Sequence, residues 1–476
     1  MAACQPKVVE VEKVVTQEVE KVVEKEVKET VVVTEKEIQV VTPTPGPKRA
    51  GEVVTIRYGT FWNMDRINIM NKGIRVFQEQ VEDVVIAVEM GGSQYRDKLA
   101  VQMAAGTEPD CGISDVFSLG RYADAGLCLD LMPACDARGM DIRNDYRLKG
   151  VEIWADKLVG MPWVTFGNAI YYNKTMFQEV GAPDPYDDLG GSWSCDQFVD
   201  ICRMLTEATG KHALNVDVTQ LHHACAGFIY GRCARLYDFR EYSYTLNEPA
   251  TVQAIEWLLH DLYEPGYIID PETRDATALA GMMDPFSGGA VAMQHMSAGN
   301  VGTTTLYVGD AFEWDIAPYP TISGSPDENS SYVSCDPNFV SANTPKREEA
   351  VDFILFCAQE EMQNILSRDK LSLPALKSAP YVEGGFLTPP PNHTAVFDEP
   401  WQTGRLVTAF FHHNTLETHK IQAREIEYVM LGEKSVQEAC DTMQKECQEL
   451  ISYETRFEPS SQWLLDFPAS MGSCRA

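Results

Sequence analysis

The sequence predicts an α/β protein with a mostly parallel sheet and two domains. From residue 53 onward, short apolar runs suited to strands alternate with longer segments of helical periodicity, and this alternation is typical of α/β folds. The chain has 476 residues, which is more than one hydrophobic core usually supports. Its hydrophobic content of 44%, with 10% aromatic residues, is that of a globular protein and not of a disordered chain.

A segment of biased composition precedes the globular part. In residues 7–41, valine pairs alternate with glutamate and lysine. The apolar spacing of three and four permits an amphipathic helix or a coiled coil, whereas the modest helix propensity of valine leaves an extended form open. Residues 42–47 are Thr-Pro-Thr-Pro-Gly-Pro, which predicts a stiff linker. Residues 1–50 are therefore expected to form a stalk.

The elements of the globular part can be placed in order. They are a strand at 53–58, a helix at 70–81, a strand at 84–88, a helix at 94–105 and a final helix at 435–450. In the first helix, Ile74, Val76 and Phe77 are expected to face inward. The second helix is expected to end at Gly106, because glycine is favoured just after a helix. The Ser- and Pro-containing tail at 456–476 is expected to be partly loose.

A strand expected from Trp163 to Tyr172 breaks its own apolar pattern. Thr165, Gly167 and Asn168 place polar groups and a flexible point between residues that favour burial. A strand that bends and shows polar groups in mid-run suits a chain that crosses between two lobes.

Residues 160–177, with a Tyr-Asn-Lys turn after the strand, resemble the first hinge of the extracellular solute-binding proteins that feed ABC sugar importers. Further segments resemble the same family, in the family's order: 104–110, 114–127, 129–133, 247–257, 286–293, 314–320 and 373–378. At Ala290 the family usually has lysine. The resemblance extends from residue 53 to about 452. It implies a periplasmic-binding-protein-like (type II) fold, in which hinge crossings join two α/β lobes around an interlobe cleft.

The resemblance also implies a division of the chain and a function. The N-lobe would comprise 51–164 plus 316–372, and the C-lobe 165–315 plus 373–455. The protein would capture a sugar or oligosaccharide in the cleft, close by hinge bending and deliver the ligand to the permease subunits of an ABC importer. Three other classes stay open: a binder of a non-sugar solute such as a peptide or polyol, a sensor receptor, and a secreted carbohydrate-active enzyme.

Sugars are bound by aromatic rings and by planar polar groups, in pockets at domain interfaces and at the ends of parallel strands. After the first strand, Trp62 is expected to stack on a sugar, or alternatively to belong to the core, and Asp65 is expected to accept hydroxyl protons. Asp115 has a second interpretation as a helix cap. The resemblance and the local pattern together place ligand contacts at Ser114, Asp115, Phe117, Thr165, Phe166, Asn168, His222, His295 and Asp336.

Several functions are disfavoured by the sequence. A net charge of −31 argues against nucleic acid, which needs a basic footprint. The chain has no nucleophile elbow, phosphate loop or dinucleotide fingerprint, so we expect neither an enzyme nor a cofactor. The pairs His222-His223 and His412-His413, with His419, lack chelating spacing, and no metal is expected. Most of the 13 cysteines are expected to act as small buried hydrophobes.

The N-terminal residues Met-Ala-Ala-Cys4 resemble the end of a bacterial lipoprotein signal, in which the cysteine becomes lipidated. With the stalk, Cys4 implies a protein anchored to a membrane outside the cytoplasm, and we expect a monomer. An ordinary cysteine after a start codon and an oligomerising coiled coil without an anchor are the alternatives. No apolar run reaches the ~18 residues needed to span a bilayer.

Overall fold

The computed structural model divides the chain into two units, Met1–Glu52 and Val53–Ala476. The residues that it describes are 11–15, 33–37, 53–114, 117–148, 152–238, 241–279, 284–329, 331–403, 406–407, 412 and 414–452. The linker at 42–47, the tail at 456–476 and Cys4 lie outside them.

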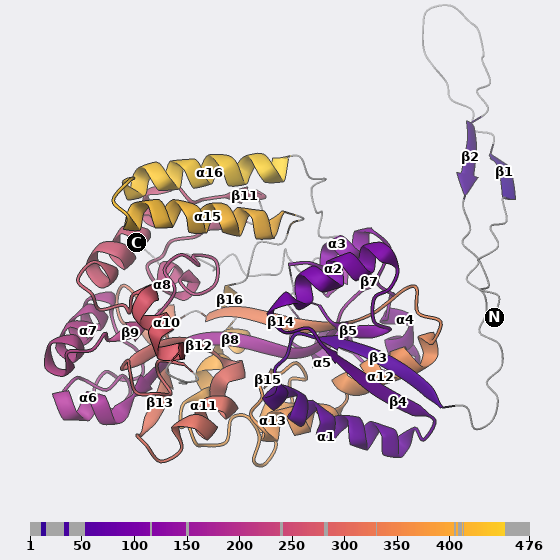
Figure 1. Ribbon diagram of the computed structural model, residues 1–476, viewed down its shortest axis with the longest axis horizontal. Coiled ribbons are helices and arrows are strands. Elements are labelled where there is room, and N and C mark those ends of the chain that lie inside the picture. The colour runs from indigo at the N-terminus through magenta and orange to yellow at the C-terminus, as the bar shows by residue number, and fades with distance from the viewer. Residues whose placement is uncertain are drawn as a thin grey trace, which may run out of the picture. The chain divides into compact units, whose positions relative to one another are not determined.

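In the first unit, two short strands form an antiparallel pair. Strand β1 (Val11–Val15) pairs with β2 (Val33–Glu37), and Val11 lies opposite Glu37 (Figure 1). Of the conformations left open for residues 7–41, these two segments adopt the extended one. The physical reason is that β-branched valines lose side-chain freedom in a helix and fit a pleated strand.

One mixed sheet runs through the second unit, in the strand order β4-β3-β5-β14-β8-β12-β9 (Figure 1). In addition, β13 and β15 pair with β8, and β16 pairs with β14. The strands are β3 (Val54–Thr60), β4 (Val84–Met90), β5 (Cys111–Ile113), β8 (Met161–Asn173), β9 (Leu214–Asn215), β12 (Met293–Ser297), β13 (Trp314–Ala317), β14 (Ser331–Val340), β15 (Leu373–Pro374) and β16 (Leu406–Val407). Two small pairs, β6 (Ile153–Trp154) with β7 (Lys157–Leu158) and β10 (Tyr237–Asp238) with β11 (Ser243–Tyr244), lie apart from it.

The sheet is less parallel than the sequence predicts. Strand β3 is parallel to β4 and β5, and β12 is parallel to β9. In the middle, however, β8 is antiparallel to β14, β12, β13 and β15, and β14 is antiparallel to β5. Helical crossovers require parallel pairing near the two ends of the sheet. Between these ends, β14 runs opposite to β5, and β8 runs opposite to both β14 and β12, so the prediction of a mostly parallel sheet is wrong.

Helix α1 (Met64–Gln80) begins before the predicted residue 70. The Asn63 side chain caps it by accepting a hydrogen bond from the backbone N–H of Arg66, and Ile74 and Phe77 are buried as predicted. Helix α2 (Tyr95–Ala105) ends at Gly106, whose φ of +65° suits glycine.

The remaining helices alternate with the strands. They are α3 (Leu119–Asp124), α4 (Met132–Ala137), α5 (Ile142–Asp145), α6 (Lys174–Val180), α7 (Cys195–Thr209), α8 (Ala226–Gly231), α9 (Pro249–Glu256), a π-helical turn (Trp257–Tyr263), α10 (Pro271–Leu279), α11 (Val301–Val308), α12 (Arg347–Ala358), α13 (Glu360–Arg368), α14 (Glu399–Thr403), α15 (Thr415–Met430) and α16 (Val436–Ser452). The predicted final helix at 435–450 corresponds to α16.

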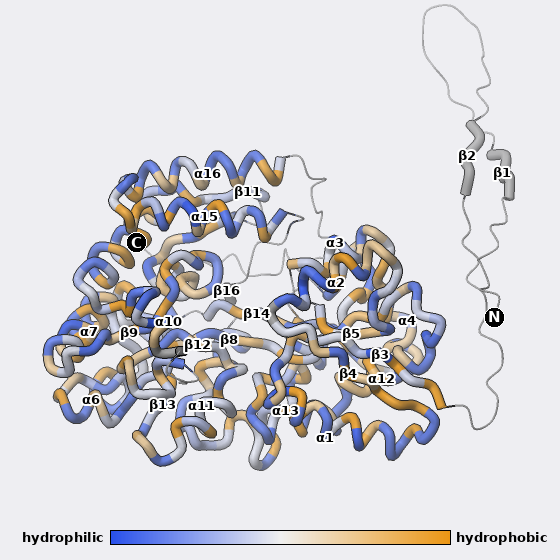
Figure 2. Tube along the Cα trace, in the orientation of Figure 1, coloured by the Kyte–Doolittle hydropathy of each residue, from blue (hydrophilic) through white to orange (hydrophobic). Residues whose placement is uncertain are grey.

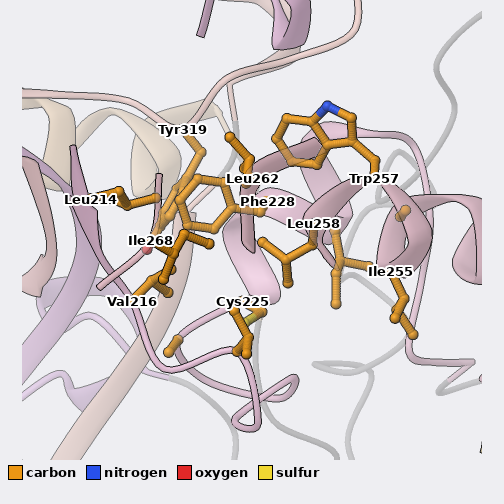
Figure 3. Close-up of a cluster of buried hydrophobic side chains, with 14 of the residues drawn as sticks. Leu214, Val216, Cys225, Phe228, Ile255, Trp257, Leu258, Leu262, Ile268 and Tyr319 are labelled. Carbon is orange, nitrogen blue, oxygen red and sulfur yellow. The ribbon is translucent and has the colours of Figure 1, made fainter. Parts of the chain in front are cut away.

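The two largest hydrophobic clusters of the second unit form the cores of two lobes. The first lobe is built on β3, β4, β5, α1, α12 and α13, and its core includes Tyr58, Trp163 and Phe353. The second lobe is built on β9, β12, β13, α6 to α9, α15 and α16, and its core is centred on Phe228 and Trp257 (Figure 3). Figure 2 shows hydrophobic residues concentrated on β3 and β4 and hydrophilic ones interspersed along α15 and α16.

Strand β8 passes from one core to the other, as its interrupted pattern predicts. Trp163 belongs to the first core and Tyr172 to the second. Between them, the backbone of β8 pairs first with β14 and β15 and then with β12 and β13. The lobe boundaries at 164/165, 315/316 and 372/373 stay predictions, although Ala317 and Tyr319 pack in the second core.

Ten described cysteines are buried and form no disulfide, which confirms the interpretation of most cysteines as small hydrophobes. Cys440 and Cys447 both face the second core from α16. Burial raises the pKa of each of these two thiols to about 12, so both remain protonated and unreactive.

Candidate functional site

A stack of two tryptophans lies where the first lobe meets the crossing strands. Trp62, just after β3, stacks on Trp163 of β8 with ring centroids 4.5 Å apart. The indole Nε1 of Trp62 donates a 3.0 Å hydrogen bond to Oδ2 of Asp336 on β14. Trp62 is only 2% exposed. Of its two interpretations, the structure therefore favours the core role, and ligand stacking by Trp62 stays a prediction.

Arg66, in the first turn of α1, joins this stack to the second lobe. Its guanidinium carbon lies 5.8 Å from the centroid of the Trp62 ring and 5.7 Å from that of Phe166. Its Nη2 donates a 3.2 Å hydrogen bond to the carbonyl oxygen of Gly299, just after β12. Burial lowers the pKa of Arg66, and the nearby Asp336 carboxylate partly opposes this effect. We call Trp62, Arg66, Phe166, Gly299 and Asp336 the arginine contact.

Four histidines form a second group, which we call the imidazole cluster: His222, His223, His295 and His419. His222 stacks in parallel on His419 with ring centroids 3.2 Å apart. His223 makes edge-to-face contacts with His295 and with Tyr332, at 5.5 and 5.3 Å between centroids.

Phe117 brings the first lobe to this cluster. It follows β5 and presents its ring edge-to-face to His419 at 5.1 Å and to His222 at 6.4 Å. Because His419 lies on α15 of the second lobe, Phe117 gives the two lobes a second point of contact.

Burial keeps three histidines of the imidazole cluster uncharged, namely His222, His295 and His419. Burial, with a smaller effect of the neighbouring His223, lowers the pKa of His222 to about 3. Burial also lowers the pKa of His295 and of His419 far below the ordinary value, again with help from neighbouring histidines. His295 Nδ1 shares a 2.6 Å hydrogen bond with the hydroxyl of Tyr319. Neutral imidazoles can both donate and accept hydrogen bonds, which suits recognition of hydroxyl groups.

Two predicted ligand contacts hold the crossing strands together. The Thr165 hydroxyl donates a 3.0 Å hydrogen bond to the Leu373 carbonyl oxygen. The Asn168 backbone N–H donates to Ser331 Oγ, which in turn donates to the Asn168 carbonyl oxygen. The Nδ2 of Asn168 is buried without a partner among the described residues, beside a cavity of about 40 Å³. Ligand contact by Thr165 and Asn168 stays a prediction.

The other predicted residues are dispersed. Ser114 is fully buried and its backbone N–H donates to the Pro337 carbonyl oxygen, whereas Asp65 is half-buried beside Arg66 in α1. Asp115 lies outside the described residues.

The structure thus brings together Trp62, Phe166 and Asp336 at one contact and Phe117, His222 and His295 near the other. Sequence reasoning did not select Arg66, Gly299 or His419 as ligand contacts. Arg66 directly follows the selected Asp65, and His419 was considered only as a metal ligand. In the described residues, no group of three or more histidine, cysteine, aspartate or glutamate side chains could hold a metal ion. None of the described helices is long and apolar enough to cross a membrane.

Comparison with known proteins places this chain in a family. The sequence profile described as "Bacterial extracellular solute-binding protein" matches residues 74–390. A search of curated protein sequences finds no match.

Solved structures match over most of the chain. An ABC substrate-binding protein from Listeria monocytogenes in complex with cycloalternan has a TM-score of 0.73 and 19% identity, covering 85% of this chain and 100% of that one. The GacH receptor of Streptomyces glaucescens, solved unliganded and with acarbose, has a TM-score of 0.70 and 17% identity, covering 84% and 99%. Maltose-bound MalE3 of T. maritima has a TM-score of 0.68 and 16% identity, covering 83% and 99%. These similarities establish the two-lobed periplasmic-binding-protein-like fold that the sequence predicts.

Proposed function

Since this chain belongs to the bacterial extracellular solute-binding protein family, we propose that it is the substrate-binding component of an ABC importer for a sugar or oligosaccharide. The ligand lies between the two lobes, and the permease subunits receive it. The observation that carries this proposal is the pair of interlobe contacts, Arg66 with Gly299 and Phe117 with His419. Side chains from both lobes converge there with aromatic rings and hydrogen-bonding groups, the chemistry that carbohydrate recognition needs.

Binding and closure are one process in this proposal. The crossing strands β8 and β14 bend, the lobes approach, and the contacts at Arg66 and Phe117 form around the ligand. The ligand then favours the closed state by binding it more tightly than the open one. The bound sugar is not transformed, so the protein acts as a binder and not as an enzyme. Trp62, Asp65, Ser114, Asp115 and Phe117 of the first lobe are the proposed ligand contacts on that side.

The proposal extends to location. The protein works outside the cytoplasm as a monomer, held at a membrane by lipid on Cys4 and spaced from it by residues 1–50. Mass spectrometry of the protein produced with its natural leader tests the anchor, since an unmodified Cys4 would refute it.

Thermal unfolding against a panel of mono- and oligosaccharides, polyols and peptides tests the binding function. A ligand at about 100 times its Kd adds about 2.7 kcal/mol to the free energy of unfolding, which raises the midpoint visibly. Small-angle scattering should then show a more compact protein with the stabilising sugar. A shift with a peptide or polyol alone would replace the sugar assignment, and conversion of an oligosaccharide into products would make the protein an enzyme.

A further inference from the structure

Arg66 carries a positive charge at the arginine contact, where the two lobes meet. Among the residues that the structure describes, no carboxylate lies at ion-pairing distance from it. Its hydrogen bond to the Gly299 carbonyl oxygen uses one of the five N–H donors of a guanidinium. Burial lowers the pKa of Arg66, which shows that the charge is costly where it lies. A half-buried guanidinium with donors to spare gains from an anionic partner.

The acidic group that acts on Arg66 is already engaged. Asp336 lies close enough to raise the pKa of Arg66, but its Oδ2 accepts the hydrogen bond from Trp62. The rings of Trp62 and Phe166 flank the guanidinium and limit the directions from which a partner can approach. This arrangement orients the planar donor fork of Arg66, and such forks match carboxylates through two parallel hydrogen bonds.

A second cation, Arg96 of α2, lies at the other contact between the lobes, near the imidazole cluster. Arg96 lies 5.9 Å from the Phe61 ring and is near enough to His419 to contribute to the lowering of its pKa. The chain as a whole has a net charge of −31, which repels anions, so an acidic ligand requires local positive charge of this kind.

We propose that Arg66 binds a carboxylate of the ligand, and that the ligands are acidic saccharides built from uronic acids. This inference rests on the proposed function and narrows its substrate class. The sugar ring lies beside the rings of Trp62 and Phe166, and its carboxylate accepts two hydrogen bonds from the Arg66 guanidinium. No bond is formed or broken.

The test compares acidic sugars with their uncharged esters. Trimers of galacturonate, glucuronate and mannuronate, each as free acid and as methyl ester, and maltotriose are titrated by calorimetry into the full-length protein. The variants are Arg66→Gln, which removes the charge, and Arg66→Lys, which keeps the charge but lacks the fork. Arg203→Gln is the matched control, because Arg203 lies exposed on α7 and pairs with Asp200. Circular dichroism and thermal midpoints show whether each variant is folded.

We expect at least one uronate trimer to bind the wild type about tenfold or more tightly than its ester, the size typical of a charge-assisted pair. Arg66→Gln should abolish this preference, Arg66→Lys should reduce it, and Arg203→Gln should leave it unchanged. Tight binding of maltotriose or of an ester, with no preference for the acid, would overturn the inference and leave the sugar-binding function intact. A preference that persists in folded Arg66→Gln would also overturn it. If no saccharide binds, the proposed function fails together with the inference.

Discussion

Acidification should destabilise the protein through the imidazole cluster. In the folded state the pKa of His222 is about 3, and those of His295 and His419 are also far below the ordinary value. In the unfolded chain each histidine has a pKa near 6.5. The unfolded state therefore binds more protons below pH ~6.5, and the stability that these histidines contribute is present above that pH and lost as the pH falls.

The magnitude follows from proton linkage. Between about pH 7.5 and about pH 5.5, each histidine that stays neutral when folded and has a pKa of 6.5 when unfolded costs about 1.4 kcal/mol of unfolding free energy. For His222, His295 and His419 together the loss is roughly 4 kcal/mol. Arg96 and His223 add to the cost of protonation, since they lower the pKa of His419.

Urea unfolding at the two pH values, in wild type and in His222→Gln, measures this effect. The variant should lose about 1.4 kcal/mol less on acidification than the wild type. Comparing the two proteins cancels the contribution of the many carboxylates, which titrate in both. An equal loss in variant and wild type would show that His222 is not held neutral in the folded protein, and would refute the reasoning. His260→Gln is a control, because His260 lies exposed beside Glu264.

Three further predictions test the junction, the crossings and the core. In Gly299→Ala, a Cβ would lie 2.7 Å from the Phe166 ring and 2.8 Å from the Arg66 guanidinium. Lobe closure should therefore cost about 1–3 kcal/mol, and ligand affinity should fall. Unchanged affinity in calorimetry would contradict a contact that forms there on closure. Asp398→Ala should destabilise the protein by about 3–5 kcal/mol in urea unfolding, because it leaves the buried guanidinium of Arg147 without its ion-pair partner; a loss below 1 kcal/mol would mean that water reaches this pair. Phe228→Ala removes a fully buried ring of the second core and should cost about 3–5 kcal/mol, whereas a negligible change in urea unfolding would mean that the core collapses around the gap.

Local patterns in the sequence were sufficient to place much of the fold. The strand at 53–58, the end of α2 at Gly106 and the final helix each depend on neighbouring residues, through apolar periodicity or glycine conformation. The start of α1 was missed because Asn63 caps the helix seven residues before residue 70, where the predicted helix begins. The direction of β8 and β14 within the sheet was also missed, since strand direction depends on the path of the whole chain.

The residues of the candidate site were likewise only partly predictable from the sequence. Trp62 and Phe117 could be selected because each follows an apolar strand, where ligand pockets occur in α/β folds. Asp336 was also expected to follow a strand, but it lies within β14. Gly299 and His419 could not be selected, because their role depends on partners that are distant in the chain, Arg66 and Phe117.

The sequence by itself determined the fold class, the crossing nature of β8 and the membership of an extracellular solute-binding family, since these depend on local patterns and ordered motifs. Only the tertiary structure decided that Trp62 stacks in the core, that Arg66 reaches across the lobes and that burial keeps His222, His295 and His419 uncharged. The physical reason is that burial and pairing are set by atoms brought together from distant parts of the chain, and the pKa of a side chain depends on that environment.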